Sequence, residues 1–201
     1  MNDNKPRGYF KYLLAMDCET SGIAFGGDDP SSNDNQTFQS VSWGFIVLEG
    51  GTLKEVERLY LEIKWDGESN WDSGAENVHG LSKAHLEERG LTKEEAACEI
   101  ANLIIKYWGP DAPICPLGHN VLFDVAFLKR LMRENGVGLK FGNRIVDSNS
   151  VGYIMLDTYN SDDLFIETGQ HERKEHNSLE DIEMTVEALR RMKLIFNAGL
   201  E

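Results

Sequence analysis

The first strong hydrophobic pattern is an apolar, aromatic-rich run at residues 9–19, YFKYLLAMDCE, which ends in acidic residues. It predicts a buried strand whose end carries polar side chains. Residues 38–49 and 52–64 then alternate apolar and polar positions on either side of Gly50 and Gly51. This alternation around a glycine pair predicts a β-hairpin. The chain therefore opens with strands.

Helical spacing begins later in the chain. Thr92 and Glu95 have the spacing of a capping box, and the apolar pattern that follows them ends at Gly109-Pro110, so a helix is predicted between these signals. Its predicted inward residues are Ala96, Ala97, Ile100, Leu103, Ile104 and Tyr107. A short strand is predicted at residues 113–118, because this segment is apolar and lies between turn-forming residues.

Two more helical patterns follow. One begins at Asn120, which we interpret as its N-cap, and ends near Gly136; the other runs from about Asn177 to Asn197. The predicted inward residues are Val121, Phe123, Phe127, Leu128 and Leu131 in the first, and Leu179, Ile182, Val186, Leu189 and Ile195 in the second. Because strands come first and strand then alternates with helix, the pattern predicts an α/β layered fold.

Two stretches are polar. Residues 26–36, GGDDPSSNDNQ, consist almost wholly of loop-forming residues and predict a surface loop insertion that follows the acid-bearing strand. Residues 157–175 precede the last helix and carry many charged side chains. We interpret them as a solvated loop in preference to a flap that brings Arg173 or Lys174 to a phosphate.

Composition favours one globular domain over residues 1–201, with 41% hydrophobic and 27% charged residues. The three cysteines have no CxxC spacing, so neither a disulfide framework nor a zinc site is predicted and a reducing cytoplasm is the expected location. The N-terminus lacks the layout of a signal peptide, and no apolar run approaches the ~18 residues that span a bilayer. We therefore expect a soluble protein.

The formal net charge of -14 argues against a partner that is itself a polyanion, because nucleic-acid affinity usually comes from basic surface. The objection weakens if some of the acids hold divalent cations, which then present positive charge where a phosphate must sit. In that case the binding of nucleic acid is predicted to need metal.

Acidic residues recur at the ends of the predicted elements. Asp17 and Glu19 are two residues apart on the first strand, so they project from one face while Cys18 points to the other. Hard divalent cations such as Mg²⁺ and Mn²⁺ prefer carboxylate oxygens. Asp124 falls in the first turn of the helix that begins at Asn120, where the helix dipole favours an ionised carboxylate. Acid pairs and helix-start acids are each common on ordinary surfaces, so neither defines a site alone.

The last helix begins with a third polar group. Asn177 is its predicted N-cap, Glu180 takes the position of the capping partner, and Asp181 lies one residue further into the first turn. His176 stays outside the helix on a loop, where a near-neutral pKa would let it accept a proton. The order of these groups along the chain, rather than any one of them, carries the functional signal.

The three blocks DCETSG, GHNVLFDVAFL and HNSLED, in this order and on these elements, resemble the DEDDh 3′-5′ exonucleases, the superfamily of polymerase proofreading domains, ribonuclease T and oligoribonuclease. The segment ENVHGLS at residues 76–82 is similar to the family's His-Gly segment that lines the pocket of the terminal nucleotide. The resemblance extends over residues 9 to about 190. It implies a ribonuclease-H-like fold, a mixed β-sheet flanked by helices in a single domain.

The resemblance also implies roles for these residues. Asp17, Glu19, Asp124 and Asp181 are the implied ligands of two Mg²⁺ or Mn²⁺ ions, and His176 is the implied general base of an in-line hydrolysis of the terminal phosphodiester. The histidine lies five residues before Asp181, as in the histidine subtype of the family. Thr20, Val78, His79, Leu81 and Asn120 are the expected substrate-binding residues.

The expected substrate is the 3′ end of DNA, single-stranded by preference, with nucleoside monophosphates as products. DNA is favoured because the run Glu19-Thr20-Ser21-Gly22 is nearer to the DNA exonucleases of the family than to oligoribonucleases. The alternatives are an exoribonuclease or oligoribonuclease that acts on short RNA, an enzyme that acts on free nucleotides, and a catalytically silent nucleic-acid-binding module. The presence of all five catalytic residues argues against the silent module, and the sequence leaves the oligomeric state open.

Overall fold

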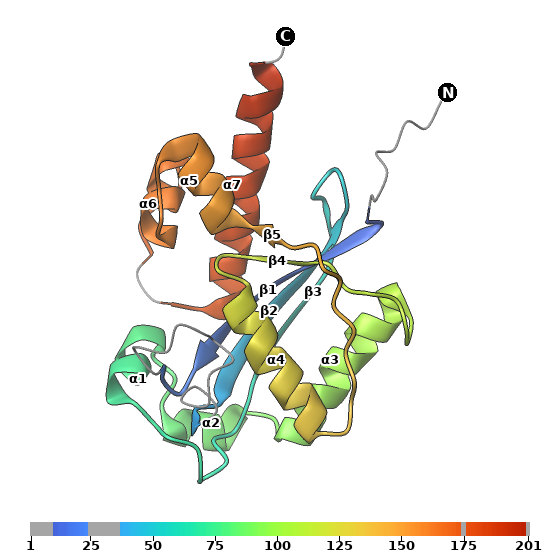
Figure 1. Ribbon diagram of the computed structural model, residues 1–201. Coiled ribbons are helices and arrows are strands. Elements are labelled where there is room, and N and C mark those ends of the chain that lie inside the picture. Colours follow the sequence, from blue (N-terminus) through green and yellow to red (C-terminus); the bar gives the residue numbers. More distant parts are fainter. Residues whose placement is uncertain (1–9, 24–36, 174–175, 200–201) are drawn as a thin grey trace.

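The computed structural model describes residues 10–23, 37–173 and 176–199. Within them the chain forms a mixed five-stranded sheet with the order β3-β2-β1-β4-β5 (Figure 1). Strands β1, β2 and β3 pair antiparallel, whereas β4 and β5 run parallel to β1. The strands are β1 Tyr12–Thr20, β2 Ser40–Glu49, β3 Glu55–Glu62, β4 Pro116–Gly118 and β5 Val146–Asp147. The insertion predicted at 26–36 lies outside the described residues.

Helices cover both faces of the sheet (Figure 1). They are α1 Ser73–His79, α2 Lys83–Arg89, α3 Lys93–Trp108, α4 Leu122–Glu134, α5 Ser148–Leu156, α6 Ser161–Glu167 and α7 Ser178–Ala198. One hydrophobic core lies between the sheet and α3 and α4, and a second lies between the opposite face and α6 and α7. Among the described helices, none combines the length and the apolar character that a membrane crossing requires.

The central strand β1 connects the two cores. Its residues Leu14, Met16 and Cys18 face α3 and α4, whereas Leu13 and Ala15 face α6 and α7. Side chains alternate along a strand, so Asp17 and Glu19 continue the row that begins at Leu13. The prediction that the two acids share one face, opposite to Cys18, is therefore confirmed, and they lie where the apolar row ends.

Several predicted elements are confirmed. The first strand and the hairpin are β1, β2 and β3, and the hairpin turns through Gly50 and Gly51. Helix α3 begins with the predicted capping box: Thr92 Oγ1 accepts a hydrogen bond from the backbone N–H of Glu95 at 3.1 Å, and the carboxylate of Glu95 accepts one from the N–H of Thr92 at 2.8 Å. The predicted strand at 113–118 is shortened to β4.

The prediction that Asn120 caps a helix is wrong. Helix α4 begins at Leu122 without a side-chain cap, and Asn120 lies in the turn before it with a φ of 56°, a left-handed conformation that asparagine tolerates better than most residues. A carboxylate from β5 instead holds the turn that precedes α4. Asp147 accepts hydrogen bonds from the backbone N–H groups of Asn120 at 3.3 Å and Val121 at 2.9 Å.

The prediction of a solvated loop at 157–175 is also wrong. This stretch contains helix α6, whose Leu164 and Phe165 are buried in the second core. The stretch returns to the sheet because these two apolar side chains pack against it, which the surrounding charges conceal in the sequence. Arg173 also turns inward, with a side chain only 7% exposed. Lys174 lies outside the described residues.

The inward pattern predicted for the last helix fails at one end. Leu189 is buried, but Ile195 is 60% exposed. Helix α7 continues past the edge of the sheet towards the C-terminus (Figure 1), so its last turns have no core to face. The rest of the pattern holds, because Ile182 and Val186 are buried against the sheet.

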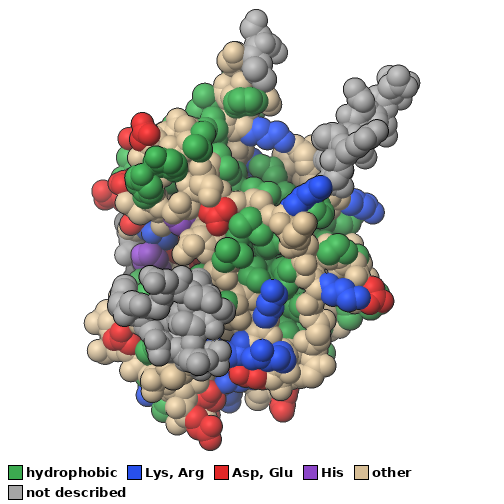
Figure 2. All heavy atoms as spheres, viewed as in Figure 1, with side chains coloured by type: hydrophobic (Ala, Val, Ile, Leu, Met, Phe, Trp, Pro, Cys, Tyr) green, Lys and Arg blue, Asp and Glu red, His purple; other side chains and the backbone are tan. Residues whose placement is uncertain are grey.

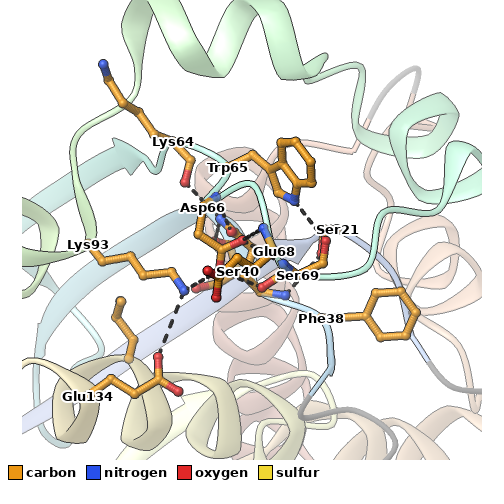
Figure 3. A network of polar contacts seen from close by, with 12 residues as sticks. Ser21, Phe38, Ser40, Lys64, Trp65, Asp66, Glu68, Ser69, Lys93 and Glu134 are labelled. Carbon is orange, nitrogen blue, oxygen red and sulfur yellow. Dashed lines mark hydrogen bonds and ion pairs between the residues drawn. The ribbon is translucent and has the colours of Figure 1, made fainter.

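A polar network fixes the loop between β3 and α1 (Figure 3). The carboxylate of Asp66 accepts hydrogen bonds from Ser69 N at 2.7 Å and from Lys93 Nζ at 2.7 Å. The hydroxyl of Ser21, at the end of β1, donates to the carbonyl of Asn70 in the same loop at 2.7 Å. The network therefore holds the chain that leads into α1 against the acid-bearing end of β1.

Candidate active site

The five residues that sequence reasoning assigned to catalysis meet at one cavity of about 430 Å³. Asp17 and Glu19 come from β1, Asp124 from the first turn of α4, and Asp181 from the first turn of α7, while His176 precedes α7. These positions span most of the chain, so the cavity exists only in the folded protein. The structure thus brings the five predicted side chains to one cavity.

A glycine lets α7 reach the end of β1. Gly44 pairs with Asp17 across β1 and β2, and a Cβ atom at Gly44 would lie 2.3 Å from the carbonyl oxygen of Ser178. Such a contact is too short for any residue with a side chain. The hydroxyl groups of Ser42 and Ser178 are 3.0 Å apart and hold the same junction. This close approach brings Asp181 beside Asp17.

The start of α7 follows the predicted capping only in part. Asn177 is the N-cap, and its Oδ1 accepts hydrogen bonds from the N–H groups of Leu179 at 3.0 Å and Glu180 at 3.2 Å. The Glu180 carboxylate, predicted to complete a capping box, instead lies 3.6 Å from Nε2 of His171. The cap of Asn177 nevertheless fixes the first turn, which holds Asp181.

Asp124 is tied directly to the strand that carries the other acids. Its Oδ1 accepts a hydrogen bond from the backbone N–H of Cys18 at 3.0 Å, and the side chain is only 3% exposed. Cys18 separates Asp17 and Glu19 in the sequence. The bond therefore draws the carboxylate of α4 to the point on β1 from which the two other acids project.

Burial and mutual repulsion disfavour the charged form of these acids. Burial, followed by the charges of Asp124, Glu19 and Asp181, holds the pKa of Asp17 well above its usual range. Burial and the charge of Asp181 raise the pKa of Glu19 to about 7, and burial raises the pKa of Asp124 to about 8. Any positive charge that enters a cluster of this kind stabilises its ionised carboxylates.

His176 lies at the edge of the cluster. Its Nδ1 is 3.3 Å from Oδ2 of Asp181, and the side chain is 37% exposed. The hydrogen bond to Asp181 raises the pKa of His176. The backbone N–H of His176 donates to the carbonyl of Val78 at 3.3 Å, which ties the histidine to the end of α1. The imidazole is thus held beside the acids and still meets solvent.

The residues present fit divalent cations. Among the described residues, none donates a hydrogen bond to the buried Oδ1 of Asp181. Ligand atoms of Glu19, His176 and Asp181 lie within 4.8 Å of one another. Buried carboxylate oxygens without partners are costly unless a cation meets them, and carboxylate oxygen is what Mg²⁺ and Mn²⁺ prefer.

A second cavity, of about 540 Å³, adjoins the acids through Cys18 and Glu19. Four of the expected substrate-binding residues line it, namely Thr20, Val78, His79 and Asn120. Leu81 is not among the described residues of this lining, and its backbone N–H donates to Nδ1 of His79 at 3.0 Å. Leu81 therefore does not line the cavity itself, but its hydrogen bond helps to orient His79, which does.

Sequence reasoning missed several residues of the second cavity. Ile23, Asp72 and Ala75 line it, and Phe123, which packs against the first core as predicted, also lines both cavities. Phe123 immediately precedes Asp124, so its place beside an expected metal ligand was the one signal available. Ile23, Asp72 and Ala75 carry no such signal, because Ile23 reaches the cavity from the chain just after β1, and Asp72 and Ala75 reach it from the start of α1.

Comparison with known proteins bears on the fold. No protein-family model matches the chain, and a search of curated proteins finds no match. Among solved structures, a zinc-bound complex of E. coli exonuclease I with single-stranded DNA superposes with a TM-score of 0.73 at 17% identity, over 92% of this chain and 41% of that one. The chain shares the fold of the part of exonuclease I that it matches.

Other exonuclease I structures agree. A complex of the E. coli enzyme with a dT13 oligonucleotide has a TM-score of 0.72 at 16% identity, covering 94% of this chain and 43% of that one. A product-bound exonuclease I has a TM-score of 0.68 at 16% identity, covering 93% and 46%. This chain thus spans less than half the length of these exonuclease I chains. The predicted ribonuclease-H-like fold, a mixed sheet flanked by helices, is confirmed.

Proposed function

We propose that the protein is a DEDDh-type 3′-5′ exonuclease, one domain that removes nucleoside monophosphates from single-stranded DNA with two bound divalent cations. The observation that carries the proposal is the meeting of Asp17, Glu19, Asp124 and Asp181 with His176 at one cavity. Exonuclease I, whose fold the chain shares, is a nuclease with structures in complex with single-stranded DNA. The fold and the residues support the same chemistry independently.

The second cavity suits the terminal nucleotide. It lies directly beside the acids, and Thr20, Val78, His79 and Asn120 offer it both polar and apolar contacts. A pocket that holds one nucleotide next to the acids places the first phosphodiester bond at the carboxylates. We propose that this adjacency makes the enzyme release one nucleotide at a time.

Asp17, Glu19, Asp124 and Asp181 would hold two Mg²⁺ or Mn²⁺ ions, which supply positive charge for the phosphate oxygens of the transition state. His176 would accept the proton of the attacking water, because it is exposed to solvent and held beside Asp181. A base must be neutral, whereas the hydrogen bond to Asp181 raises the pKa of His176. A cation that shares the charge of Asp181 opposes this effect.

Cation binding also answers the charge objection. The protein has a formal net charge of -14, and on the face shown in Figure 2 the lysine and arginine side chains lie in small, separate groups. Phosphate affinity from such a surface is weak. We propose that DNA binding depends on the cations at the acidic cavity.

The free thiols of Cys18, Cys98 and Cys115 support a cytoplasmic location, where thiols stay reduced.

The proposal is tested with single-stranded DNA labelled at its 5′ end and incubated with Mg²⁺, Mn²⁺ or a chelator. We expect a ladder that shortens one nucleotide at a time from the 3′ end, and no shortening in the chelator. The same strand labelled at its 3′ end is expected to release labelled mononucleotide at once. Duplex DNA and RNA of the same sequence serve as comparison substrates.

Each outcome of this assay has a definite meaning. Faster degradation of RNA than of DNA would replace the DNA assignment by the exoribonuclease alternative. Loss of the 3′ label only after the full strand is degraded would contradict the 3′-5′ direction. Absence of hydrolysis with every substrate and metal would favour the silent binding module.

A further inference from the structure

An arginine joins the acidic cavity from the segment between α6 and α7. The guanidinium of Arg173 bridges two aspartates, with Nη2 2.7 Å from Asp162 and Nη1 2.9 Å from Oδ2 of Asp181. It also lies 5.2 Å from the ring centroid of the buried Phe165. With a side chain only 7% exposed, Arg173 is a built part of the cavity.

The charges around Arg173 make its position unusual. Among the described residues that line the cavity, Arg173 is the one lysine or arginine, and it faces the four clustered carboxylates. It contacts Asp181 on Oδ2, whereas the buried Oδ1 receives no hydrogen bond from the described residues. One oxygen of Asp181 therefore meets a fixed cation, and the other is left for a second one.

Two cations that share one carboxylate repel each other. The repulsion is strong where water is largely excluded, because the effective dielectric constant is lower there than in bulk solvent. A divalent cation on Oδ1 of Asp181 would lie close to the guanidinium on Oδ2. Asp162 opposes this repulsion, since it binds the same guanidinium from the side away from Asp181 and is itself 62% exposed.

We propose that Arg173 is a positioning residue that neutralises Asp181 in the metal-free protein and competes there with the divalent cation. Asp162, which binds the same guanidinium, then sets how strongly Arg173 pairs with Asp181. The inference rests on the proposed function, because it concerns the same metal site. It adds that metal affinity is tuned by a residue outside the four proposed ligands.

The first test is calorimetric titration of Mn²⁺ into metal-free protein without nucleic acid. Arg173→Gln removes the charge and keeps a polar side chain, so Mn²⁺ is expected to bind about tenfold more tightly, the effect of removing one like charge a few ångströms away. Arg191→Gln is the matched control. Arg191 also binds a carboxylate, that of Glu187, but lies outside the described lining of the cavity, so its loss should leave the affinity unchanged.

The second test runs in the opposite direction. Asp162→Asn frees the guanidinium to bind Asp181 more fully, so Mn²⁺ is expected to bind about three- to tenfold more weakly. This variant changes an exposed side chain, so it keeps the test available if Arg173→Gln does not fold. In the double variant, Asp162→Asn should add almost nothing to Arg173→Gln, because its effect passes through Arg173.

The outcomes separate this inference from the function on which it rests. If the unaltered protein binds no Mn²⁺ and hydrolyses no nucleic acid, the proposed function fails. If it binds Mn²⁺ but Arg173→Gln leaves the affinity unchanged or lowers it, competition by Arg173 is refuted. Unchanged affinity in Asp162→Asn, or an equal loss with and without Arg173, would refute it as well.

Discussion

Asp181→Asn is expected to lower the hydrolysis of single-stranded DNA by on the order of 10³-fold or more, because a metal ligand supplies several kcal/mol of transition-state stabilisation. The amide keeps the size of the carboxylate but not its charge, and Oδ1 of Asp181 is the buried oxygen without a hydrogen bond from the described residues. Asp17→Asn should behave alike, since Asp17 lines the same cavity. The measurement is the initial rate of mononucleotide release at saturating Mg²⁺.

The matched control for this prediction is Glu180→Gln. Glu180 is the neighbour of Asp181 in the first turn of α7, but its side chain is 50% exposed. We expect it to keep most of the activity, and circular dichroism should show that all three variants are folded. Activity of folded Asp181→Asn near that of the unaltered protein would reject Asp181 as a metal ligand.

His176→Ala is expected to lower the rate about 10²- to 10⁴-fold, the usual contribution of a general base, while Mn²⁺ binding is largely retained. A base acts in its neutral form, so the rate of the unaltered enzyme should rise with pH as His176 loses its proton. In the metal-free protein the hydrogen bond to Asp181 raises the pKa of His176; a cation on Asp181 opposes this shift, so the rise with bound metal should come at lower pH than that raised pKa alone would give. The variant should lack the rise.

His171→Ala is the matched control for the histidine. Its side chain is 72% exposed and lies 3.6 Å from Glu180, outside the described lining of the cavity. Its pH-rate profile should coincide with that of the unaltered protein. A His176→Ala variant that keeps both the rate and the pH dependence would show that another group, or hydroxide from solution, takes the proton.

The parts of this protein that could be predicted from sequence are those in which local chemistry and tertiary position agree. Asp17 and Glu19 share a face because side chains alternate along any strand. Thr92 and Asn177 begin helices because their side chains accept hydrogen bonds from nearby backbone N–H groups. Local rules do not predict that the acids converge on one site. That prediction came from the order of the three blocks and the family resemblance that it carries.

The parts that could not be predicted depend on contacts distant in sequence or on short elements. Helix α6 has seven residues, too few for a clear helical period among its charges. Asn120 has the side chain of a good N-cap, but the carboxylate of Asp147, 27 positions later, holds its backbone N–H in the turn before α4. Arg173 looks like a surface residue until the fold places Asp162 and Asp181 on either side of it.

The raised pKa values in the acidic cavity make the stability of the metal-free protein depend on pH. Glu19 and Asp124, with pKa values raised to about 7 and about 8, hold protons near neutral pH when no cation is present. Their folded-state pKa values lie above the unfolded ones, so the stability that they contribute is lost as pH rises through 7 and 8. On the proposed function, bound cations would take the place of these protons and would also provide the positive charge that DNA requires.

The most direct test of this account is a crystal of the protein soaked in Mn²⁺ and measured for anomalous scattering. We expect two peaks about 3.5 to 4 Å apart, with ligands drawn from Asp17, Glu19, Asp124 and Asp181. Soaked crystals of Asp181→Asn should lose at least one of them. Peaks elsewhere, or none near these four carboxylates at millimolar Mn²⁺, would contradict the central claim.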